Sequence, residues 1–190
     1  RRKVDDFVLH VAPEMHAQSR WSRHSLDLHV SSKLKQYVDE SREFGGNFGA
    51  EATTVIDVRH DLKVLAFGSY RFGQEEFGEG EAVVGKPRRR LSDPADFHVM
   101  KSGALIAKHF NRLWLEFGGA FTYASYDDTA LSQTLGFDRD FRTGTIAEGM
   151  AKVGYEVSPN TSLFVEGRYN ERDYGHGLFD SHGYRVLGGL

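Results

Sequence analysis

The feature that most constrains this chain is a two-residue alternation of apolar and polar side chains that persists over long stretches. In the stretch that ends at Val157, Val153 and Val157 share one parity, whereas Glu148, Lys152 and Glu156 share the other. Successive side chains of a β-strand point to opposite sides, so this stretch is expected to form a strand with one apolar and one charged wall. No long segment places apolar residues at helical spacing. The sequence therefore predicts an all-β fold.

The alternation divides the chain into nine expected strands, with connections that alternate in length. The strands are expected at residues 4–17, 23–37, 46–58, 62–72, 96–108, 112–126, 141–157, 162–174 and 182–190. Short connections fall at 18–22, 59–61, 109–111 and 158–161, and long ones at 39–45, 73–94, 127–140 and 175–181. This regular pattern is typical of an antiparallel up-and-down meander, as in outer-membrane β-barrels with short periplasmic turns and longer outer loops.

Two of the expected strands, 62–72 and 96–108, depart from the pattern because they place cations in phase with large apolar residues. These are Lys63 and Arg71 with Leu65 and Phe67, and Lys101 with Val99 and Leu105. A β-bulge in such a strand would shift the phase and restore the separation of the two walls.

Composition narrows the classes of protein that the chain can belong to. No run approaches the roughly 18 consecutive apolar residues of a membrane-spanning helix, and the mean hydropathy of −0.48 argues against a helical membrane protein. A β-barrel hides its membrane signal, since only alternate residues are apolar. The formal net charge of −3 gives no reason to expect a nucleic-acid partner. The absence of cysteine excludes disulfides, thiolate metal sites and a cysteine nucleophile.

Aromatic residues gather at both ends of the expected strands, which indicates the two interfacial bands of a membrane barrel. Near the long connections lie Phe44, Phe48, Tyr70, Phe72, Tyr123, Tyr126, Phe141, Tyr174 and Tyr184. Near the short turns lie Trp21, Phe110, Trp114 and Tyr155. Trp114 has the parity of Glu116 and is therefore expected on the charged side. The simpler alternative is that aromatic residues favour strands in general.

The charged wall is the candidate functional surface. Its expected members are Glu51, Asp57, Glu116, Glu148, Lys152, Glu156, Glu166, Arg168 and Arg172. In a barrel these residues would line a watery lumen, where opposite charges pair across strands and influence what passes. On a soluble sheet they would form a solvent-exposed face. The number of long strands favours the lumen.

The sequence gives only weak support for an anion-binding, metal or catalytic site. The arginines at 88–90 are suited to anionic lipopolysaccharide or polysaccharide, although a solvated loop is the favoured interpretation. The nine histidines show no metal-site spacing. Glu148 and Glu166, on neighbouring strands, are the one carboxylate pair considered for glycoside cleavage. The sequence therefore predicts no catalytic residues, no metal, no cofactor and no enzyme activity.

Several strand-and-turn motifs resemble a known family. They lie at residues 21–26, 110–115, 153–159 and 180–184, and the strongest is Val165-Glu166-Gly167-Arg168-Tyr169-Asn170-Glu171-Arg172-Asp173-Tyr174. These stretches are similar to outer-membrane β-barrel porins encoded with exopolysaccharide biosynthesis genes in proteobacteria. The resemblance implies a bacterial outer-membrane location and a part in polysaccharide export. It supplies no catalytic residues.

The sequence and the resemblance together give a set of expectations. The chain is expected to be one domain, residues 1–190, forming part of a transmembrane β-barrel that is truncated at its C-terminal end. Its expected function is a pore or export channel for exopolysaccharide. The alternatives are an outer-membrane enzyme acting on lipid or polysaccharide, and a soluble carbohydrate-binding β-sandwich. The expected partners are outer-membrane lipid, lipopolysaccharide, polysaccharide and export-machinery proteins, with no nucleic acid.

Overall fold

The computed structural model describes residues 7–37, 44–74, 96–127, 142–175, 177 and 179–190, which form one antiparallel sheet. Its strands are β1 (Val8–Val11), β2 (Glu14–Arg20), β3 (His24–Tyr37), β4 (Phe44–Arg59), β5 (Leu62–Gln74), β6 (Asp96–Phe110), β7 (Leu113–Tyr126), β8 (Gly144–Ser158), β9 (Thr161–Tyr174) and β10 (Ser181–Gly189). Among the described residues there is no helix with the length and apolarity needed to cross a membrane. The predicted all-β meander is confirmed.

The first expected strand, 4–17, is interrupted once, at Ala12 and Pro13, and so becomes β1 and β2. Both halves pair with β3, and they keep one register, because Val11 pairs with Leu34 and Glu14 pairs with Ser31. Proline has no N–H to donate to a ladder and is confined to edge strands and strand ends. β1 and β2 therefore act as one edge strand with a local break.

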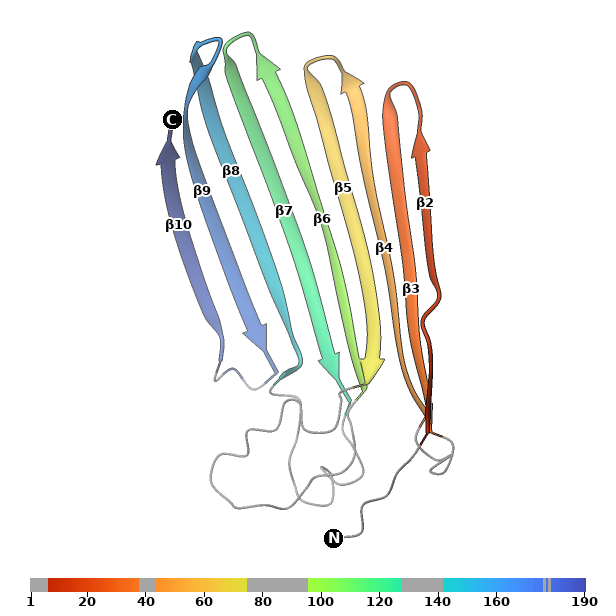
Figure 1. The fold of residues 1–190 in the computed structure, drawn as a ribbon. Coiled ribbons are helices and arrows are strands. Elements are labelled where there is room, and N and C mark those ends of the chain that lie inside the picture. Colours follow the sequence, from red (N-terminus) through yellow and green to blue (C-terminus); the bar gives the residue numbers. More distant parts are fainter. Residues whose placement is uncertain (1–6, 38–43, 75–95, 128–141, 176, 178) are drawn as a thin grey trace.

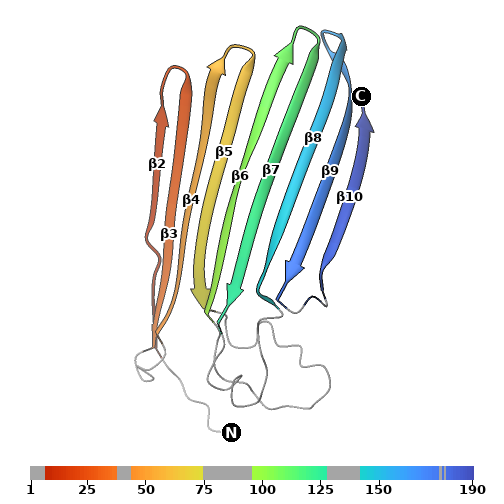
Figure 2. The same cartoon turned by 180° about the vertical axis from the view of Figure 1, so that it is seen from behind.

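The remaining strands follow one another in chain order, from β3 to β10 (Figures 1 and 2). The short turns lie together at one end of the sheet, and the strand ends that precede and follow the longer connections lie at the other. Two-residue turns join β4 to β5, β6 to β7 and β8 to β9. Asn111 has a φ of 56° in the second of these turns, a left-handed conformation that asparagine tolerates. The sheet is open, with β1 and β2 at one edge and β10 at the other.

The register sorts the side chains into two faces. The apolar face of β5, β7 and β8 carries no Asp, Glu, Lys, Arg or His. On β7 and β8 most of its large side chains are exposed, with Phe117 at 54% and Val153 at 42%. Large side chains on the opposite, charged face, such as Phe67 and Leu105, are only partly exposed. Side chains crowd on the inner side of a curved sheet, so we infer that the charged face is the concave one.

The sheet has a single layer, and no described side chain is fully buried. A sandwich would bury Val153 and Val165 between two sheets, but both side chains are exposed on the apolar face. The soluble β-sandwich alternative therefore has no second layer in the part of the chain that the structure describes.

No bulge shifts the phase of the facing strands β5 and β6. Pairing runs without a shift from Leu62–Lys108 to Gln74–Asp96, so Leu65, Phe67 and Leu105 do share the charged face with the cations. The register shifts lie instead beside two of the turns, between Asp57 and Arg59 and between Glu156 and Ser158. There the bulges adapt the strand ends to two-residue turns.

The aromatic bands are only partly on the apolar face. Phe48, Tyr70 and Phe72 lie there at the long-connection end beside His98, and the hydroxyl of Tyr70 lies 2.8 Å from Nδ1 of His98. Tyr123, Tyr184, Phe110 and Tyr155 also belong to this face. Tyr126 and Tyr174 instead have the register of the charged face, as does Trp114. Phe141 and the side chain of Phe44 lie outside the described part of the chain.

Candidate functional site

The nine residues expected on the charged wall all lie on one face of the sheet. Unbroken register pairs connect them across the strands from β4 to β9. Four of them, together with Lys63 and Ala107, form one row near the short turns: Asp57, Lys63, Ala107, Glu116, Lys152 and Glu166. The charges in this row alternate in sign on either side of Ala107. Opposite charges on directly facing positions stabilise neighbouring strands.

Glu166 on β9 is the centre of the best-formed charge cluster. Only 6% of the residue is exposed. Its carboxylate accepts a hydrogen bond from Nε of Arg168 and lies 3.9 Å from Nζ of Lys152. A shielded carboxylate needs such partners, because an unpaired buried charge is costly. Glu166 therefore links β9 to β8 through Lys152, while Arg168 binds it within its own strand.

Lys152 is further enclosed by two aromatic rings that the sequence did not place in the site. Its Nζ lies 5.1 Å from the centre of the Trp114 ring and 4.5 Å from that of Phe164. Such cation–π contacts add to the ion pair. The parity that Trp114 shares with Glu116, and Phe164 with Glu166, is the sequence signal that identifies both rings as members of this face.

Gly154 makes room for Trp114. A Cβ atom at Gly154 would lie 2.1 Å from the indole, a distance that no side chain can adopt. The ring therefore lies directly against the backbone of β8, and its position depends on a glycine at this point. The same relation holds between Phe164 on β9 and Gly189 on β10, where a Cβ would meet the ring at 2.6 Å.

The other expected members of the charged wall lie apart from this cluster. Glu51 on β4 pairs with Arg71 on β5, with 3.3 Å between the carboxylate and guanidinium atoms. Glu156 faces Ser162 beside the turn between β8 and β9. Arg172 lies at the opposite end of β9. The structure thus distributes the predicted set along the full height of the sheet.

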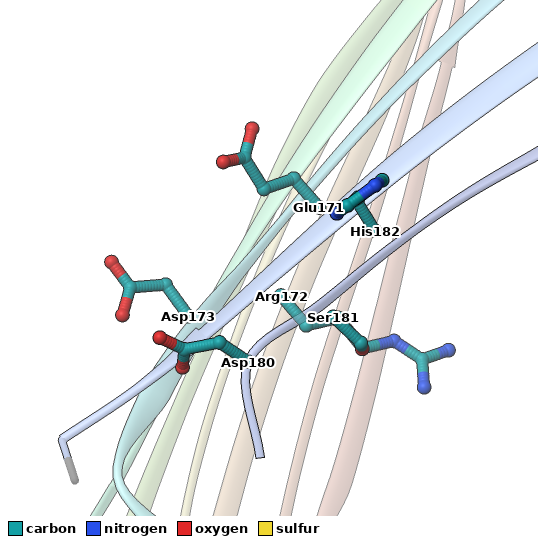
Figure 3. Close-up of a pocket in the computed structure, with 6 residues that line it drawn as sticks. All are labelled: Glu171, Arg172, Asp173, Asp180, Ser181 and His182. Carbon is teal, nitrogen blue, oxygen red and sulfur yellow. The ribbon is translucent and has the colours of Figure 1, made fainter. Parts of the chain in front are cut away.

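Arg172 borders a shallow hollow of about 200 Å³ between β9 and β10. Its lining residues are Glu171, Arg172, Asp173, Asp180, Ser181 and His182. Figure 3 shows the carboxylates of Asp173 and Asp180 on one side and the guanidinium of Arg172 directed to the other. Asp180 accepts a hydrogen bond from the backbone N–H of Tyr174, at 2.8 Å. This contact closes the connection between the two strands.

Glu148 and Glu166 do not face each other across β8 and β9. Glu148 faces Asn170, and Glu166 faces Lys152, so the two carboxylates are offset by four residues along neighbouring strands. Four residues correspond to about 13 Å of strand. The two acids of a glycosidase stand about 5 to 9.5 Å apart. The register therefore does not bring the two carboxylates to directly facing positions.

The described histidines form no second site. His24 and His29 lie on opposite faces of β3, and Nε2 of His16 lies 2.9 Å from the carboxylate of Asp27. The described residues contain no group of three or more metal-ligating side chains. The arginines at 88–90 and His176 lie outside the described residues.

Comparison with known proteins gives the family. No curated protein and no solved structure matches the chain. One family model does match, and it covers residues 1–190. Its description as a porin agrees with the long antiparallel strands and the charged concave face, and it supports a channel in a membrane rather than an enzyme. The chain belongs to the family described as "Putative beta-barrel porin 2".

Proposed function

We propose that this chain forms the wall of a bacterial outer-membrane pore through which exopolysaccharide is exported. The family supports a pore in general. The observation that carries the proposal further is the continuous charged face, which runs across β4 to β9 on the more crowded side of the sheet. Its opposite face presents large apolar side chains, which lipid would cover.

A polar polymer fits such a wall. Mixed charges and hydroxyl groups offer many weak, exchangeable hydrogen bonds, and passage requires binding that is favourable but easily reversed. The ion pairs Glu51–Arg71 and Lys152–Glu166 leave little net charge on the wall. A neutral or weakly anionic polysaccharide is therefore the proposed substrate. Outer-membrane lipid, lipopolysaccharide and other proteins of the export machinery are the proposed partners.

Conductance measurements test the pore. The full-length protein in planar lipid bilayers is expected to give discrete, ohmic current steps. Glu116→Gln on the charged face is expected to shift the reversal potential in a salt gradient toward anion selectivity. Glu171→Gln, which removes a carboxylate from the other face, is the matched control and should leave the potential unchanged.

Export is tested separately in the producing bacterium. Deletion of the protein should retain polysaccharide in the periplasm, and the intact protein should restore its release. Current steps together with undiminished polysaccharide release from the deletion strain would support the pore but reject exopolysaccharide as its substrate. Absence of current steps together with normal release would reject both.

A further inference from the structure

The charged face contains an unexpected apolar area on β4 to β8, which we call the inner apolar patch. It consists of Val55, Leu65, Phe67, Val99, Leu105 and Met150. Val55, Leu65, Leu105 and Met150 belong to one register row, with Gly118 between the last two. The row crosses four interstrand spacings, or roughly 19 Å. The patch is therefore a strip running across the strands.

Two glycines allow this strip to be smooth. The ring of Phe67 lies over Gly103, where a Cβ would meet it at 2.6 Å, and Leu105 lies over Gly118, where a Cβ would meet it at 2.9 Å. Both side chains thus lean along the sheet instead of projecting from it. The result is a flat and mainly aliphatic surface on the side of the sheet where polar residues are expected.

Lys101 lies beside the patch and has no carboxylate partner among the described residues. Its Nζ is 5.8 Å from the centre of the Phe67 ring, and its register neighbours are Ser69 and Thr122. Two cations on the neighbouring strand β5 are paired: Lys63 lies 3.7 Å from Asp57, and Arg71 lies 3.3 Å from Glu51. Lys101 is also exposed. It therefore offers a free positive charge flanked by two hydroxyl groups.

We propose that the inner apolar patch and Lys101 bind a single-chain amphiphilic anion, with its acyl chain along the strip and its carboxylate on Lys101. An apolar strip facing water is unfavourable and commonly marks a binding surface. Aliphatic side chains suit an acyl chain, whereas stacking of sugar rings requires aromatic faces, and Phe67 is the one aromatic residue of the patch. The ammonium of Lys101 supplies the charge complement. The proposal does not depend on polysaccharide export.

Photo-crosslinking tests it. The probe is a long-chain fatty acid with a diazirine near the middle of its chain, added to the full-length protein in phosphatidylcholine bilayers. Adducts are mapped to single residues by fragment mass spectrometry. The expected adducts are on Leu65, Phe67 and Leu105. Val64 and Ile106 are internal controls, because they lie on the same strands but belong to the opposite face and report contact with bulk lipid.

Variants of Lys101 separate the contribution of the carboxylate head group from that of the acyl chain. Lys101→Gln should lower the yield of inner-face adducts by at least about tenfold, because it removes a charge-assisted hydrogen bond, while adducts on Val64 and Ile106 stay constant. Lys101→Arg should restore the yield. The fatty alcohol of the same chain length should label the inner face no better than the Lys101→Gln variant does.

Three results would overturn the proposal. The first is labelling confined to Val64, Ile106 and other residues of the apolar face. The second is unchanged inner-face labelling in Lys101→Gln, which removes the assigned role of the lysine. The third is inner-face labelling that an acidic oligosaccharide displaces and excess unlabelled fatty acid does not. That result would assign the surface to a sugar polymer instead.

Discussion

Two regions of the charged face both contain ion pairs, but the pairs differ in how far they are exposed to solvent. On β8 and β9, Glu166 is shielded and held by Lys152 and Arg168, with Trp114 and Phe164 enclosing the cluster. On β4 and β5, the pair Glu51–Arg71 is largely exposed, and its neighbours on the same face are small or polar, namely Gly49, Thr53, Ser69 and Gly73. The difference teaches that alternation fixes the side to which a residue points, while its surroundings decide whether its charge stabilises the sheet.

The largest expected effect is the loss of the shielded carboxylate. Glu166→Ala leaves Lys152 and Arg168 without their shared partner in a crowded place, and an orphaned charge there is costly. The midpoint of urea unfolding in lipid vesicles should fall further than in any other single carboxylate variant of the charged face. A midpoint close to that of the Glu51→Ala variant would break the comparison between the two regions.

A second test concerns the glycine beneath Trp114. Gly154→Ala forces the indole away from β8 and should lower the free energy of unfolding by about 1 to 3 kcal/mol, as overpacking does. Gly149→Ala on the same strand is the matched control, because a Cβ there meets nothing within 4 Å. Trp fluorescence should shift in the first variant alone. Equal stability of the two variants would contradict the packing described around Lys152.

The exposed pair on β4 and β5 should contribute little. Glu51→Gln is expected to change the free energy of unfolding by about 0 to 1 kcal/mol, since solvent and salt screen exposed ion pairs. Unfolding at low and at high salt measures this. If Glu51→Gln lowered the free energy of unfolding at high salt by more than Glu166→Gln does, the exposed pair would stabilise the sheet more than the shielded one, contrary to this expectation.

The smallest effect is expected from Asp61, in the turn between β4 and β5. Its carboxylate is bound by the ammonium of Lys108, which holds the pKa of Asp61 below its ordinary value of 3.8. This contribution to stability is present above the unfolded-state pKa and is lost as the pH falls through the lower folded-state pKa. Stability measured against pH should therefore fall less steeply in acid for Asp61→Asn. Identical acid profiles would show that the turn contact does not stabilise the fold.

The sequence predicted the strands well because their faces are opposite in polarity over many residues. Residues 112–126 and 162–174 correspond to β7 and β9 within one residue at each end. The side of the sheet was also predicted for Glu116, Lys152 and Glu166, because it depends only on parity within each strand. The mixed polarity of β5 and β6 was visible in the sequence as well, and Leu65 and Phe67 do face the charged side without any bulge.

Alternation alone therefore determined the fold class, the succession of strands from β3 to β10 and the side to which each residue points. The tertiary structure decided which side chains meet. Glu148 and Glu166 are both on neighbouring strands and on one face, yet a four-residue offset separates them. That offset is set by the turn and the bulge at residues 156–161. Register depends on this local backbone geometry, which a two-residue pattern does not encode.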